Sequence, residues 1–136
     1  MNDYVRLRMG NVCNNNCMFC DAFGEKAKNK TTVQLKKELR VIKDFSQTVI
    51  FTGGEPTLRK DLLELLSHAK GLGFRSIAIR SNGRMFSYPD FCRKVIGAGA
   101  NVFMIKVFHH PEMKHDDITR LKGSLRQSVA GMNNLF

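Results

Sequence analysis

The sequence predicts an α/β fold in which tandem strand–helix units build a parallel sheet, as in a partial, truncated TIM-like barrel. Four short apolar or alternating segments, typical of strands, each precede a segment with helical periodicity. Tandem units of this kind pair as parallel strands through right-handed crossovers. The polar, chemically reactive residues fall just after the predicted strands, where parallel α/β folds place their ligand sites.

Each predicted element has a signal of its own. Apolar residues alternate with polar ones, or run together, over about four to eight residues in each strand. We expect strands at 4–9, 48–52, 75–81 and 101–108. Apolar residues recur with helical spacing between and after these strands. We expect helices at 31–45, 61–73, 88–99 and 124–135.

Capping signals support three of the helix starts. Thr31 and Gln34 have the spacing of a capping box, and so do Ser124 and Gln127. Asp61 is placed as the N-cap of the second helix.

We expect residues 1–136 to form a single domain, because the chain is long enough to bury a core. By chain order, the strand at 101–108 lies at an edge of the sheet. An exposed edge rich in Val, Phe, Met and Ile is an aggregation hazard. Either another element covers it or the rest of a barrel is missing, and we favour a missing remainder.

The chain is strongly basic, with a net charge of +10 and a pI of about 9.8. This balance favours an anionic partner, such as RNA or a phosphorylated ligand, although solvated lysine-rich surfaces explain it as well. Two tyrosines and no tryptophan give little support for stacking on bases.

The sequence points to the cytoplasm. No apolar run approaches the roughly 20 residues of a membrane span, and the first residues lack the apolar core of a signal peptide. In a reducing compartment, clustered cysteines more often bind a metal or do chemistry than form disulfides.

Three of the four cysteines, Cys13, Cys17 and Cys20, lie close together after the first strand. Disulfides among them would close only small, strained loops. Three thiolates can hold three corners of an iron–sulfur cube and leave one iron open to a non-protein ligand. A structural zinc site needs four protein ligands, so zinc would have to recruit Cys92 or a histidine. We expect Cys92, in the third predicted helix, to be a small buried apolar residue.

Three asparagines, Asn14, Asn15 and Asn16, separate the first two cysteines. A chain that wraps a cluster needs residues near left-handed φ, which Asn tolerates better than most. Amide donors near cluster sulfurs also help to set the reduction potential. We therefore expect replacement of all three by alanine to shift the potential of a bound cluster.

At these residues the sequence resembles the radical S-adenosylmethionine (radical SAM) superfamily. The spacing Cys13-x-x-x-Cys17-x-x-Cys20, with Phe19 before the last cysteine, resembles its cluster-binding signature. GGEPTL after the second strand resembles its second motif, and SNG after the third resembles its common TNG. The resemblance covers nearly the whole chain and implies a partial barrel of the radical SAM type.

The resemblance also implies cofactors. In that family the three cysteines hold a [4Fe–4S] cluster, and the amino and carboxylate groups of S-adenosylmethionine chelate the open iron. Carried over, Cys13, Cys17 and Cys20 are the cluster ligands, and Phe19 lies beside the adenine.

The GGEP motif is expected to face the methionine amino group of S-adenosylmethionine. Gly53, Gly54 and Glu55 would do so largely through backbone carbonyls, because paired glycines admit a close approach. Pro56 would stiffen the turn. An ordinary strand-to-helix turn is the alternative for this motif.

The ends of the third and fourth strands carry weaker signals. Ser81 and Asn82 are expected to contact the methionine carboxylate or to form the wall of the site, with a simple turn as the alternative. After the fourth strand the family usually has Ser-x-Asp for the ribose, whereas this chain has Lys106, His109 and His110. We expect the histidine pair on a loop surface.

The activity implied is reductive cleavage of S-adenosylmethionine to a 5′-deoxyadenosyl radical, which abstracts hydrogen from an unknown substrate. It requires an electron donor such as flavodoxin or ferredoxin. The chain holds about four of the usual six strand–helix units of the barrel, so we expect a missing C-terminal part or a completing partner. The alternatives are a basic zinc-binding module for nucleic acid and an inactive truncated remnant.

Overall fold

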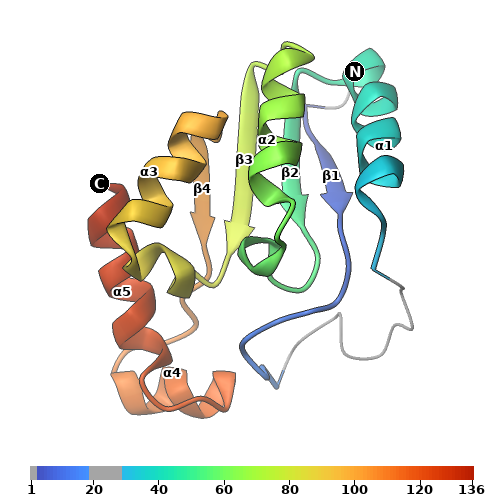
Figure 1. Ribbon diagram of the computed structural model, residues 1–136. Helices are drawn as coiled ribbons and strands as arrows, with labels where there is room; N and C mark the ends of the chain where they lie inside the picture. Colours follow the sequence, from blue (N-terminus) through green and yellow to red (C-terminus); the bar gives the residue numbers. More distant parts are fainter. Residues whose placement is uncertain (1–2, 19–28) are drawn as a thin grey trace.

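A computed structural model describes residues 3–18 and 29–136, and within them it shows a four-stranded parallel sheet (Figure 1). The strands are β1 (Val5–Arg8), β2 (Thr48–Thr52), β3 (Ser76–Ser81) and β4 (Val102–Ile105). They lie in the order β1-β2-β3-β4, and each pairs in parallel with its neighbours. The predicted fold class is therefore confirmed.

Helices connect and follow the strands. The described α-helices are α1 (Thr32–Phe45), α2 (Leu62–Gly71), α3 (Pro89–Ala98), α4 (Glu112–Thr119) and α5 (Ser124–Leu135). Two short 3₁₀ turns, η1 (Pro56–Leu58) and η2 (Arg84–Ser87), follow β2 and β3. All helices except α4 match the predicted ranges to within a few residues.

Helix α4 was missed because its sequence, EMKHDDIT, is almost entirely polar. Only His115 and Thr119 are buried in it, so it carries no amphipathic stripe of apolar residues. Its position after β4 is set by tertiary contacts, which sequence periodicity does not reveal.

The hydrophobic core lies on the face of the sheet that α1, α2 and α3 cover (Figure 1). Successive strand residues point to opposite faces, so one alternate set of apolar residues forms this side. The fully buried members of this set, on β1, β2 and β3, are Leu7, Val49, Phe51, Ile77 and Ile79.

The opposite face of the sheet carries basic as well as apolar side chains. Arg6 of β1, Arg80 of β3 and Met104 of β4 line a groove of about 420 Å³ there. Strand β4 lies at the edge of the sheet, as predicted, and Val102 and Met104 are 39% and 43% exposed.

Helix α1 begins with the predicted capping box. The side chain of Thr31 accepts a hydrogen bond from the backbone N–H of Gln34 at 3.2 Å, and the Gln34 side chain accepts one from the backbone N–H of Thr31 at 2.9 Å. Asp61 stands at the N-cap of α2 as predicted, but its carboxylate makes no capping bond. It binds Arg59 and Thr32 instead.

The predicted capping box of α5 is wrong. Gly123 is the N-cap, and Ser124 is already the first helical residue. The carboxylate of Asp116, from α4, caps the helix by accepting from the backbone N–H groups of Gly123 at 2.6 Å and Leu125 at 3.0 Å. The Ser124 hydroxyl donates to the same carboxylate at 2.9 Å, and the N–H of Gln127 donates to the carbonyl of Gly123 at 3.2 Å in place of the Ser124 side chain.

Within residues 3–18 and 29–136, no helix combines the length and the apolar content that a bilayer span requires.

Candidate cofactor site

The cysteine loop follows β1 and lies at the carboxyl edge of the sheet. Cys13 is exposed and Cys17 is partly exposed. Phe19 and Cys20 lie outside the described residues. The cysteine loop is thus placed, with two of its three predicted cluster ligands, beside the turns that follow β2 and β3.

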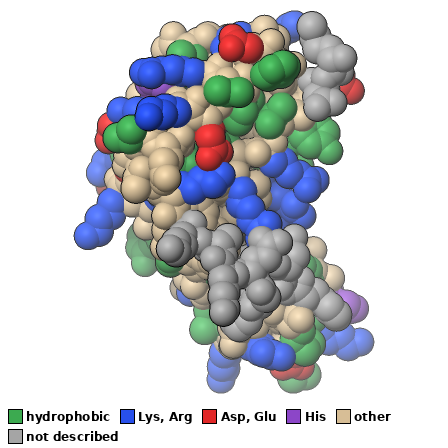
Figure 2. All heavy atoms as spheres, turned by 90° about the vertical axis from the view of Figure 1, so that its right-hand side faces the viewer, with side chains coloured by type: hydrophobic (Ala, Val, Ile, Leu, Met, Phe, Trp, Pro, Cys, Tyr) green, Lys and Arg blue, Asp and Glu red, His purple; other side chains and the backbone are tan. Residues whose placement is uncertain are grey.

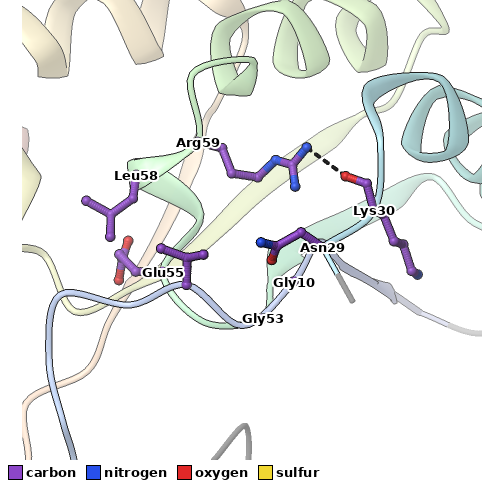
Figure 3. A pocket seen from close by; sticks show the side chains of 8 residues that line it. Gly10, Asn29, Lys30, Gly53, Glu55, Leu58 and Arg59 are labelled. Carbon is purple, nitrogen blue, oxygen red and sulfur yellow. Dashed lines mark hydrogen bonds between the residues drawn. The ribbon is translucent and has the colours of Figure 1, made fainter. Parts of the chain in front are cut away.

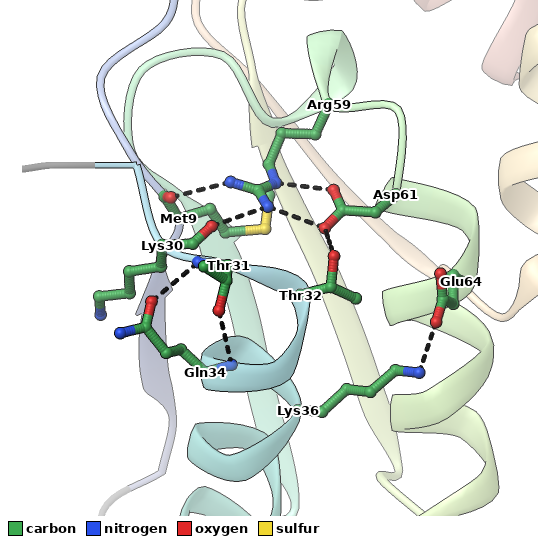
Figure 4. A network of polar contacts seen from close by, with 9 residues as sticks. All are labelled: Met9, Lys30, Thr31, Thr32, Gln34, Lys36, Arg59, Asp61 and Glu64. Atoms are coloured by element: carbon green, nitrogen blue, oxygen red, sulfur yellow. Dashed lines mark hydrogen bonds and ion pairs between the residues drawn. The ribbon is translucent and has the colours of Figure 1, made fainter.

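The two ends of the cysteine-bearing segment are held together by one arginine (Figure 4). Arg59 donates to the carbonyls of Met9 at 3.1 Å and Lys30 at 3.0 Å, which flank the segment. Asp61 accepts two hydrogen bonds from the same guanidinium, at 2.8 Å each, and one from Thr32 at 2.6 Å. These contacts, led by the hydrogen bond from Arg59, hold the pKa of Asp61 below its usual value of 3.8 despite burial.

The glycine pair of the GGEP motif packs against the cysteine loop. Gly53 and Gly54 have φ of +93° and +51°, a region that favours glycine. A Cβ on Gly54 would lie 2.3 Å from the carbonyl oxygen of Val12, and the next N–H, of Glu55, donates to that oxygen at 2.7 Å. Because the two glycines have no side chains, the backbone of the cysteine loop packs directly against them. The sequence motif did not reveal this packing role.

Glu55 joins the ends of β2 and β3. Its carboxylate is 2% exposed and accepts hydrogen bonds from the Ser81 hydroxyl at 2.7 Å and from the Asn82 N–H at 2.8 Å. The hydroxyl and N–H of Thr57 add bonds at 2.6 and 3.2 Å. These donors occupy the carboxylate, and the backbone N–H of Glu55 is engaged by Val12, while its carbonyl accepts from the N–H of Leu58 at 3.2 Å and keeps one lone pair.

Asn82 carries this network to the cysteine loop. Its side-chain amide donates to Oδ1 of Asn14 at 2.6 Å and lies 4.0 Å from Sγ of Cys13. The backbone N–H of Asn15 donates to the same sulfur at 3.4 Å. Glu55, Ser81 and Asn82 thus lie together, and two N–H donors lie near the sulfur of Cys13.

The asparagines of the loop act through side-chain and backbone contacts and not through unusual backbone angles. Among the described residues other than glycine, only Arg120 has a positive φ, so the expectation of left-handed asparagines is wrong. Asn16 donates its N–H to the carbonyl of Thr119 at 2.9 Å, which docks the loop on the end of α4. The guanidinium of Arg84 binds the carbonyl of Asn14 and the side chain of Asn15, a contact that sequence motifs gave no means to find.

A small pocket opens beside the GGEP motif (Figure 3). It measures about 230 Å³, and its lining includes Gly53 and Glu55 of the motif and Gly10 of the cysteine loop. Lys30 and Arg59 also line it. Two residues of the GGEP motif therefore border a cavity that also has two basic neighbours.

The remaining candidates lie elsewhere. Cys92 is 2% exposed within the core, and its thiol donates to the carbonyl of Phe86 at 3.1 Å, which confirms the expected buried role. Burial raises the pKa of this thiol. His109 and His110 are exposed, as expected, and Lys106 is partly exposed.

Two titratable groups of α4, His115 and Asp116, have shifted pKa values. Burial lowers the pKa of His115 below 6.5, partly offset by the Asp116 carboxylate. Burial alone would raise the pKa of Asp116, but the N–H donors of Leu125 and Gly123 outweigh it and bring the pKa below 3.8. Nδ1 of His115 accepts the N–H of Phe108 at 3.1 Å.

One face of the molecule is rich in basic side chains (Figure 2). In the view of Figure 2, Lys and Arg side chains dominate the charged surface, and Asp and Glu are scattered. This agrees with the net charge of +10.

The fold and the arrangement of motifs define a class. The family model of the radical SAM superfamily matches residues 7–136, and the chain belongs to this superfamily. Enzymes of this class use a [4Fe–4S] cluster and S-adenosylmethionine, and they need an electron donor.

Several similar proteins share one name. A "Probable GTP 3',8-cyclase" of Saccharolobus islandicus (strain L.S.2.15 / Lassen #1) is 39% identical over 101 residues, which cover 70% of this chain and 31% of the relative. A protein of the same name from Metallosphaera sedula is 31% identical over 132 residues, covering 94% of this chain and 41% of the relative. The matched part of the chain thus spans only 31% to 41% of the length of these relatives.

Proposed function

We propose that this chain is the cofactor-binding part of a radical SAM enzyme. Cys13, Cys17 and Cys20 hold a [4Fe–4S] cluster, and S-adenosylmethionine binds at the open iron. One observation carries the proposal: the cysteine loop, the GGEP turn and the SNG turn meet at one edge of the sheet through Glu55, Asn82 and Asn14.

The described residues fit such a cluster. Cys13 and Cys17 are at least partly accessible, and the Cys13 sulfur receives N–H donors from Asn15 and Asn82, at 3.4 and 4.0 Å. Donors of this kind are typical around cluster sulfurs, where they help to set the potential. When bound, the cluster supplies one electron for cleavage of the sulfonium of S-adenosylmethionine.

The chain contributes binding and orientation. Gly53, Gly54 and Glu55, followed by Pro56, are assigned to the methionine amino group through backbone carbonyls. The engagement of the Glu55 carboxylate by Ser81 and Asn82 supports this assignment, because it removes that side chain as a competing acceptor for the amino group.

Phe19 is assigned to the adenine. Ser81 and Asn82 are assigned to the wall of the site near the methionine carboxylate. Their contacts to Glu55 and to the cysteine loop support a role in shaping that wall.

The substrate is proposed to be anionic. Arg6 and Arg80 line the groove on the sheet face opposite the helices, which would face the interior of a completed barrel. GTP, named for the relatives, is one such anion, and RNA is another. A C-terminal part or a partner would close this groove, and a flavodoxin or ferredoxin in the cytoplasm would supply electrons.

Anaerobic reconstitution with iron and sulfide tests the proposal. We expect a brown, oxygen-labile protein with about four irons per chain. Cys17→Ala should abolish the cluster, whereas Cys92→Ala, at a buried thiol outside the loop, should retain it. A colourless protein with one tetrahedral zinc would favour the zinc module, and uptake of neither metal would favour an inactive remnant.

The same preparation tests the activity. We expect the isolated chain to cleave S-adenosylmethionine poorly with dithionite, because about two of the usual six strand–helix units are absent from it. Rapid formation of 5′-deoxyadenosine by the isolated chain would contradict the need for a completing part.

A further inference from the structure

Arg84, the first residue of η2, reaches from the SNG turn to the cysteine loop. Its Nη1 donates to the backbone carbonyl of Asn14 and to Oδ1 of Asn15, the latter at 3.0 Å. Its Nε donates to Oε1 of Gln127, on α5, at 2.6 Å. One side chain therefore joins the loop between Cys13 and Cys17 to two elements that lie far along the chain.

The peptide group between Asn14 and Asn15 is the centre of this arrangement. Its carbonyl accepts from Arg84, and its N–H donates to Sγ of Cys13 at 3.4 Å. Because the peptide group is planar, a guanidinium that fixes the oxygen also fixes the direction of the N–H. A cation at the oxygen end also polarises the amide, which makes the N–H a stronger donor.

The base from which Arg84 extends is rigid. The Ser128 hydroxyl of α5 donates to the carbonyl of Asn82 at 2.7 Å. A Cβ on Gly131 would lie 2.2 Å from the carbonyl oxygen of Gly83, so α5 and the SNG turn pack at backbone contact. The guanidinium is thus presented from a fixed turn to the loop, as a positioning group requires.

We propose that Arg84 is a positioning residue that directs the Asn15 N–H onto the Cys13 sulfur and thereby raises the reduction potential of the cluster. The part that concerns the potential rests on the proposed function. Hydrogen bonds to a ligating sulfur and nearby positive charge stabilise the reduced, more negative cluster, so both effects move the potential upward.

Arg84→Gln is the test variant, and Arg93→Gln is the matched control. Arg93 has a side chain that is 72% exposed and pairs with Asp90 within α3, so its replacement removes the same charge away from the loop. The reduction potential of the reconstituted protein is measured by redox titration followed by electron paramagnetic resonance. We expect a lower potential in Arg84→Gln, an unchanged one in Arg93→Gln, and partial recovery in Arg84→Lys, which keeps the charge without the planar fork.

A second measurement uses the metal-free protein. Loss of the charge-assisted bond should let the Asn15 amide exchange with solvent about tenfold faster or more in Arg84→Gln, while Arg93→Gln leaves it unchanged. Equal exchange at Asn15 would overturn the positioning role. An unchanged potential in a fully loaded Arg84→Gln protein would overturn the link to the cluster.

The two failures are distinguishable. If the unsubstituted protein takes up no cluster, the proposed function fails, while the exchange of Asn15 in the metal-free protein still decides the role of Arg84. If Arg84→Gln loses its near-ultraviolet circular dichroism, Gln127→Ala replaces it. This variant removes only the support of Nε and should change exchange and potential less, in the same directions; no change in either would count against the proposal.

Discussion

Glu55→Gln should destabilise the metal-free protein even before any cofactor is considered. Oε1 of Glu55 accepts three hydrogen bonds, two from Thr57 and one from Ser81, and Oε2 accepts the N–H of Asn82 at 2.8 Å. A glutamine keeps only one acceptor oxygen. In the orientation that preserves three bonds, its NH₂ group faces the Asn82 N–H, so two donors oppose each other inside a site that is 2% exposed.

The expected loss follows from this geometry. A hydrogen bond to a charged acceptor contributes about 1.5–3 kcal/mol, and a buried N–H left without an acceptor costs about 1–3 kcal/mol more. The reduced desolvation of a neutral side chain offsets part of this sum. We therefore expect the free energy of unfolding to fall by about 3 kcal/mol, a large part of the stability of a small domain.

Urea unfolding of the metal-free protein, followed by circular dichroism, measures the change. With a typical dependence on urea, the midpoint should fall by roughly 1–3 M. The control is Glu64→Gln, since Glu64 pairs with Lys36 at the surface with a side chain that is 57% exposed, and such pairs contribute about 0–1 kcal/mol. If Glu55→Gln shifts the urea midpoint no more than Glu64→Gln does, the reasoning is refuted.

Further predictions concern packing, pH and the cluster. Gly131→Ala should destabilise the protein by about 1–3 kcal/mol through a backbone clash, whereas Gly97→Ala, with nothing within 4 Å of the added Cβ, should be neutral or stabilising by urea unfolding. Burial lowers the folded pKa of His115. The stability that the neutral side chain contributes is therefore present above pH 6.5 and is lost as the pH falls through the folded pKa. His115→Gln should flatten this part of the pH–stability profile. The pKa of Asp116 is also lowered, because hydrogen bonds from backbone N–H groups outweigh the effect of its burial. The stability from this helix cap is therefore complete above pH 3.8 and is lost as the pH falls below it. Asp116→Asn should remove this loss of stability at acid pH.

Much of the fold could be predicted from local patterns. Alternation and helical spacing identified the four described strands and four of the described helices, because most of these elements bury apolar residues at regular spacing. The capping box at Thr31 and Gln34 was equally local, since both partners lie within one helical turn. Helix α4 and the start of α5 escaped, because polar contacts between two helices decide them and no local apolar pattern marks them.

The site divides in the same way. The amino-acid sequence by itself placed the cysteines, the GGEP turn and the SNG turn at the carboxyl ends of successive parallel strands, because chain order and crossover handedness determine which ends meet. Only the tertiary structure decided that Glu55 is enclosed by donors from β3 and that Arg84 holds the peptide beside Cys13. These hydrogen bonds join residues that lie 27 to 70 positions apart in the sequence. They depend on the register of the strands and on the packing of α5, which no short stretch of sequence contains.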